Sequence, residues 1–118
     1  MAAPMNITNV QAIIAAGQSL SAEADIGPGV LVGIVIPAGW TNAALTFQIS
    51  VDGINWAEMV NVANTAISYG PASAGQFVAV DPTLWRGVVA LKLRSGTLGT
   101  PVVQAAQQTL TLVTKVLP

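Results

Sequence analysis

The sequence predicts an all-β fold, and within that class a single-domain antiparallel β-sandwich of jelly-roll type. Three observations predict it: Val, Ile and Thr are abundant, short segments alternate apolar with polar residues, and Gly and Pro recur at regular intervals. The 118 residues suit one domain with one core. We expect the sandwich over residues 10–118. Residues 1–9 are expected to form an extended arm, because they carry no charge and include Pro4.

The first half of the chain is expected to supply strands at residues 8–15, 18–26, 30–36 and 45–51. Apolar and polar residues alternate along 18–26, which indicates a strand with one exposed face. Residues 30–36 are apolar on both faces, so this strand is either central or has one face against a neighbouring subunit. Alternation is cleanest along 45–51, where the odd-numbered residues are expected to face one side of the sheet and the even-numbered residues the other side.

The second half is expected to supply strands at residues 56–60, 66–69, 76–80, 88–94 and 109–117. Asp52-Gly53 is a strong hairpin signal that leads into the first of these strands. Asp81 is expected to cap a short helical turn that begins at Pro82. Lys92 and Arg94 alternate with apolar residues, so both side chains are expected to point outward.

The charge content is the most unusual property of the composition. Only 8% of the residues are charged, while 53% are hydrophobic and the mean hydropathy is +0.64; an ordinary soluble domain has about a quarter of its residues charged. The longest apolar runs, residues 12–16 and 30–38, fall far short of the ~20 residues that span a bilayer. A sparsely charged surface that is not a membrane span is typical of a protein covered by other proteins in an assembly.

Part of the sequence resembles discoidin-type jelly-roll modules. The segment from Phe47 to Trp56, followed by Trp85-Arg86 and by Leu91 to Ser95, has their pattern of a strand ending in Ser-x-Asp-Gly-x-x-Trp before an Arg-bearing strand. This resemblance covers about half of the chain and implies the fold. It transfers no binding residue, because such modules bind sugars or lipids through loops that vary freely.

A second resemblance covers roughly residues 34–114. Ile36 to Trp40, Leu45 to Gln48, Leu91 to Thr97, Pro101 to Gln104 and Leu110 to Val113 follow one another as in small proteins encoded among tailed-phage structural genes. This resemblance implies a virion component of the head decoration, or cement, type. It implies no active site.

Catalysis and metal binding are the weakest hypotheses. The chain has no His and no Cys, which removes the usual general bases and nucleophiles. Its five acids are Glu23, Asp25, Asp52, Glu58 and Asp81. The first two are expected to face water, and Asp52 and Asp81 already have turn and cap roles. We therefore expect no enzyme, no cofactor and no metal site, and the net charge of −1 disfavours nucleic acid as a partner.

The candidate site is a protein contact surface. Its expected members are Met5 and Ile7 in the arm, Trp40 and Trp85 at sheet corners, and the cations Arg86, Lys92 and Arg94. Trp is enriched where proteins meet, and cations in so charge-poor a chain are candidates for interface ion pairs. Trp40 and Trp85 also permit an alternative role in stacking against a sugar. Trp56 is expected to lie in the core.

These observations together predict a non-enzymatic virion structural protein that binds the outside of a phage capsid and stabilises it. Its expected partners are the major capsid protein and copies of itself, with a trimer favoured because decoration proteins of this size are often trimeric. No contact with nucleic acid or membrane is expected, and the protein would be made in the cytoplasm of a bacterial host. The alternative is a carbohydrate-binding adhesin module of a phage tail or fibre.

Overall fold

The computed structural model describes residues 7–116, which form a sandwich of two antiparallel β-sheets, as predicted. Its elements are β1 (Ile7–Ile14), β2 (Ala24–Asp25), β3 (Val30–Val35), β4 (Ala43–Ser50), β5 (Ala57–Glu58), β6 (Tyr69–Ala72), β7 (Phe77–Ala79), the 3-10 helix η1 (Pro82–Trp85), β8 (Ala90–Ser95) and β9 (Gln108–Lys115). No helix in this part of the chain is long and apolar enough to cross a membrane.

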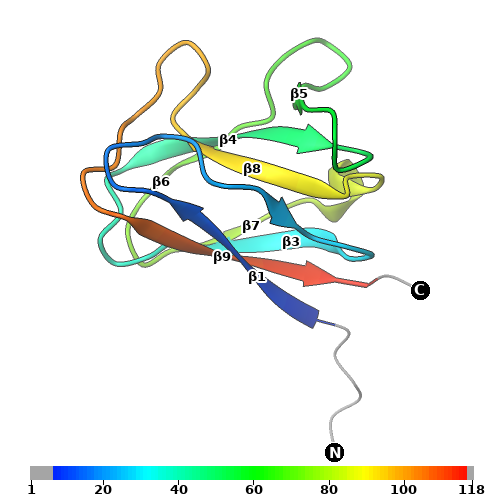
Figure 1. Cartoon of the computed structure of the whole chain (residues 1–118), viewed down its shortest axis with the longest axis horizontal. Coiled ribbons are helices and arrows are strands. Elements are labelled where there is room, and N and C mark those ends of the chain that lie inside the picture. Colours follow the sequence, from blue (N-terminus) through cyan, green and yellow to red (C-terminus); the bar gives the residue numbers. More distant parts are fainter. Residues whose placement is uncertain (1–6, 117–118) are drawn as a thin grey trace, which may run out of the picture.

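The order of the strands is that of a jelly roll. One sheet has the order β1-β9-β3-β7, and the other has the order β2-β8-β4-β5, with β6 paired to β4 as an addition. Strands from the start and the end of the chain therefore alternate within each sheet, as two interlocked Greek keys require. Figure 1 shows the two sheets as stacked layers, with β1, β9 and β3 in one layer and β4 and β8 in the other.

The core lies between the two sheets and is made of aliphatic and aromatic side chains from both. Its largest fully buried members are Ile14, Leu31, Ile34, Leu110 and Leu112 from the first sheet, and Leu45, Phe47, Leu91 and Leu93 from the second, with Trp85 from η1. Phe47 and Trp85 pack edge to face with their ring centroids 4.8 Å apart. Such aromatic pairs contribute about 0.5–1.5 kcal/mol beyond the area that they bury.

The boundary expected between arm and sandwich is wrong by three residues. Ile7, Thr8 and Asn9 pair with Lys115, Thr114 and Val113 of β9, so these three residues belong to the first sheet. The backbone of residues 7–9 supplies hydrogen-bond partners to the backbone of β9, whose edge facing β1 would otherwise lack them. Residues 1–6, and with them Met5, lie outside the described residues.

The strand expected over residues 18–26 is mostly irregular. Only Ala24–Asp25 forms a strand, while Gln18 and Leu20 each make a single bridge, to Gln104 and Arg94. This segment crosses from one sheet to the other, so it cannot keep one partner strand along its length. The Asp52-Gly53 turn and the Asp81 cap are confirmed: Gly53 has φ +78°, and the Asp81 carboxylate accepts a hydrogen bond from Thr83 N–H at 3.0 Å.

Candidate interaction surface

The outer face of the four-stranded sheet has no charged side chain over most of its extent. Its outward residues are Asn9, Gln11 and Ile13 of β1, Thr109, Thr111 and Val113 of β9, Gly33 and Val35 of β3, and Phe77 and Ala79 of β7. We call these ten residues the charge-free face. Lys115, which pairs with Ile7 and Val30, adjoins them at one end of the sheet.

The charge-free face exposes large apolar side chains. Phe77 is 57% exposed, Val35 is 40% exposed and Ile13 is 37% exposed. The Phe77 ring lies across Gly33: a Cβ atom built on Gly33 would come within 2.1 Å of its Cζ atom. Glycine at position 33 therefore allows the ring to lie flat on the sheet. A flat apolar face on a pleated sheet suits packing against another protein surface.

The opposite sheet carries a hydrogen-bonded charge network. The Arg94 guanidinium donates from Nη1 and Nη2 to the two Glu58 carboxylate oxygens, both at 2.7 Å, and Nη1 also donates to Thr46 Oγ1 at 3.3 Å. Gln48 Nε2 donates to Glu58 Oε2 at 3.0 Å. The hydrogen bonds from Arg94 hold the pKa of Glu58 below its usual range.

The expectation that Arg94 points into water is wrong. Its side chain is only 6% exposed, because its guanidinium lies against the sheet, hydrogen-bonded to Glu58 of β5 and Thr46 of β4. Thr46 and Ser50, which lie on the same side of β4 as Gln48, are 2% and 1% exposed. Thr46 Oγ1 donates to the Gly96 carbonyl at 2.7 Å. Arg94 thus has its partner within the protomer and is removed from the candidate contact residues.

Trp40 and Trp85 were expected to be accessible at sheet corners, and both are buried. Trp85 is fully buried, with its Nε1 3.2 Å from the Tyr69 hydroxyl oxygen that accepts its hydrogen bond. Trp40 is 5% exposed, and its Nε1 donates to the Ala72 carbonyl at 3.1 Å. Both tryptophans lie near the ends of strands, but β6 supplies their hydrogen-bond partners, Ala72 and Tyr69. Neither is available for a subunit contact or for a sugar.

Trp56, expected in the core, is only half-buried on the outer side of the second sheet. The Lys92 ammonium lies 4.4 Å from the centre of its ring, within the range of a cation–π contact. Lys92 is therefore half-buried against an aromatic ring rather than free. Because the cation occupies a face of the ring, Trp56 makes a poor platform for a sugar.

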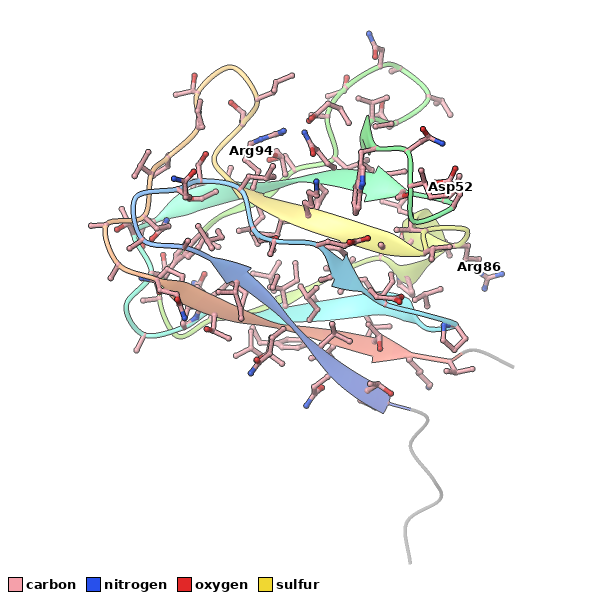
Figure 2. The ribbon with its side chains drawn as sticks, in the orientation of Figure 1. Asp52, Arg86 and Arg94 are labelled. Carbon is pink, nitrogen blue, oxygen red and sulfur yellow. The ribbon has the colours of Figure 1, made fainter. Side chains whose placement is uncertain are left out.

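Arg86 is the exposed cation of the predicted set. It lies at the same end of the molecule as Asp52, and its side chain points away from the sandwich (Figure 2). It lines a cleft of about 290 Å³ together with Val51, Val60 and Leu84, which are 66%, 44% and 43% exposed. This cleft is a second apolar surface, at the end of the sandwich rather than on a sheet.

The exposed carboxylates near this end serve their own loops. Asp52 Oδ1 accepts hydrogen bonds from the backbone N–H groups of Ile54 and Asn55, both at 2.8 Å, and these bonds hold the pKa of Asp52 far below its usual range. Hydrogen bonds from Thr83 likewise lower the pKa of Asp81. Among residues 7–116 no three acids lie close enough together to share a metal ion.

Comparisons with known proteins add no relative. No protein-family model matches the chain, and neither the curated proteins nor the solved structures searched contain a match. The discoidin-type and phage-protein resemblances therefore stay predictions. The contact surface is assigned from its geometry alone. Sequence reasoning missed Phe77 as a member, although the all-apolar segment 30–36 had indicated a covered strand face.

Proposed function

We propose that this protein is a non-enzymatic structural subunit of a tailed-phage virion, which binds the outside of the capsid and stabilises it as a decoration protein. The observation that carries the proposal is the charge-free face, which offers ten uncharged outward residues on one sheet. Surfaces of monomeric proteins seldom expose aromatic and aliphatic side chains on a whole sheet face that carries no charge. The phage setting rests on the sequence resemblance.

The mechanism follows from burial of this face. Covering apolar surface contributes about 25 cal/mol per Å², from which the costs of association are subtracted. A decoration protein bridges neighbouring capsomers in many copies, so the shell gains stability even when each copy binds weakly. The partner that the proposal assigns to the face is the major capsid protein.

The adhesin alternative depended on Trp40 and Trp85 being exposed. It needs an exposed aromatic platform, and Trp40 and Trp85 are buried while Lys92 covers a face of Trp56. No observation on the described residues specifically favours sugar binding. The decoration role is therefore the one function that we propose.

The test compares phage heads assembled with and without this protein. We expect the protein on the outer surface of purified heads, and we expect heads that lack it to release DNA at a lower temperature. Adding back the purified protein should restore the release temperature. Purified particles that contain no copy of the protein, or heads equally stable without it, would contradict the proposal.

A further inference from the structure

Among residues 7–116, no strand pairs with the outer edge of β1. β1 is the outermost strand of its sheet, and its eight residues pair with β9 in one register without a bulge. Edge strands are normally protected by charged residues, proline or bulges. Residues 7–11, Ile-Thr-Asn-Val-Gln, contain none of these.

The direction of the backbone groups along β1 follows from one hydrogen bond. The Ile13 carbonyl accepts from Ala22 N–H at 3.0 Å, so Ile13 directs its backbone groups away from β9. Residues two apart in a strand point the same way. Ile7, Asn9 and Gln11 therefore also direct their N–H and C=O groups outward, where the strand leaves the cover of the segment around Ala22.

A cleft lies beside this edge, on the inner side of the strand. It has a volume of about 270 Å³, and it runs between Thr8 and Val10 of β1 and the turn that contains Ile26 and Pro28 (residues 26–29). Asp25, the only acid that lines it in the described part of the chain, accepts a hydrogen bond from Gly27 N–H at 2.8 Å. The sandwich is thus not closed along β1, and a strand added there would place its inward side chains at the mouth of the cleft.

We infer that β1 pairs with β1 of a second copy of this chain, antiparallel about a two-fold axis, to give a dimer with one continuous eight-stranded sheet. Residues 7–11 can pair with the same residues of the second copy. In this register Asn9 lies opposite Asn9 of the partner subunit, and Ile7 lies opposite the partner's Gln11. Each of the three opposed pairs exchanges two main-chain hydrogen bonds, which gives six. Thr8 and Val10 then lie opposite each other on the inner side, at the clefts of both copies.

A second copy suits this edge better than a strand from another protein for two reasons. The register that uses all three outward residues is symmetric, as an isologous contact requires. The segment also has no charge that would select a partner of opposite charge. The pairing would join the charge-free faces of two copies into a single sheet surface. It gives two-fold symmetry, unlike the trimer that the phage resemblance implies.

The first experiment measures the mass of the isolated protein by sedimentation equilibrium at tens of micromolar. We expect about 24 kDa, the mass of two 12.0-kDa chains. Asn9→Pro should give a monomer, since it removes a donor that points away from β9 and leaves the bonds to β9 in place. Asn9→Lys, which keeps that donor but sets two like charges opposite each other at the axis, should also shift the protein to monomer. Asn9→Ala is the matched control and should stay dimeric.

The second experiment tests the register by cross-linking. The chain has no cysteine, so a single introduced cysteine can oxidise only with its own copy. Asn9→Cys should form a disulfide-linked dimer, since residues opposite each other in a hydrogen-bonded pair have Cα atoms about 5.5 Å apart. Gln11→Cys should not, because its two copies would lie roughly 13 Å apart along the strands.

Several results would overturn the inference. They are a monomeric or trimeric wild-type protein, a dimer that survives both Asn9→Pro and Asn9→Lys, and a disulfide formed by Gln11→Cys in preference to Asn9→Cys. A wild-type monomer whose β1 edge pairs only with capsid protein would also overturn it. The measurements use purified protein and no phage head, so their failure is distinct from a failure of the decoration role.

Discussion

Replacing Trp85 by alanine separates a core tryptophan from a contact tryptophan. The side chain is fully buried, packs edge to face on Phe47 and donates a hydrogen bond to the Tyr69 hydroxyl. An aromatic side chain buries about 150–250 Å², which at ~25 cal/mol per Å² gives roughly 4–6 kcal/mol. Measured losses for Trp→Ala in protein cores are about 3–5 kcal/mol. We expect the free energy of unfolding to fall by that amount, a large part of the 5–15 kcal/mol that is typical of a domain.

The assay is guanidinium unfolding at one fixed protein concentration, so that association contributes equally to every variant. Leu84→Ala is a matched control, because Leu84 lies next to Trp85 in η1 but is 43% exposed. It should cost less than about 1 kcal/mol. If Trp85→Ala cost as little as the control while it abolished association, Trp85 would be a contact residue and the core described above would be wrong.

Three further predictions concern the two outer faces. Phe77→Ala should weaken head binding by about 2 kcal/mol, or roughly 30-fold, in a co-sedimentation assay. The control Leu98→Ala removes a loop side chain that is 66% exposed and should leave head binding unchanged. Equal effects of the two substitutions would contradict a role for the charge-free face in binding. Gly33→Ala should displace the Phe77 ring and weaken head binding with little change in melting temperature, and undiminished binding would contradict this. Arg94 lowers the pKa of Glu58 from its ordinary 4.5, so this pair stabilises the fold above pH 4.5 and less so as the pH falls below it. Glu58→Gln should therefore show a smaller loss of urea resistance between neutral and acid pH than the wild type, and an equal loss would refute the role of the pair.

The sequence could predict what depends on neighbours along the chain. Alternation and turn residues placed most strands within a few residues, and Asp81 was recognised as a cap because Pro82 follows it. The positions of the tryptophans depend instead on a distant segment. Trp40 finds its carbonyl partner at Ala72, and Trp85 finds its hydroxyl partner at Tyr69. No local pattern shows that β6 crosses over both.

The same limit applies to polar residues on the strands. Alternation assigns Thr46 and Arg94 to the outer side of their sheet, but it does not tell whether a loop covers that side. Here the Glu58 carboxylate accepts hydrogen bonds from Arg94, and the Gly96 carbonyl accepts one from the Thr46 hydroxyl, although both acceptors lie elsewhere in the sequence. The contact surface was indicated only indirectly, because Phe77 stands in a segment of small residues and its position over Gly33 depends on the pairing of β7 with β3.

The two outer faces differ in a way that orients the protein on its proposed partner. If the five-stranded sheet met the capsid, the Arg94–Glu58 pair and the Lys92–Trp56 contact would lose the water that still reaches them. Removing water from an ion pair costs more than its attraction returns unless new partners are provided. Burial of the charge-free face dehydrates no ion pair, and its Asn, Gln and Thr side chains need only hydrogen-bond partners in the interface. We therefore expect the four-stranded sheet to face the capsid and the charged sheet to face the solvent.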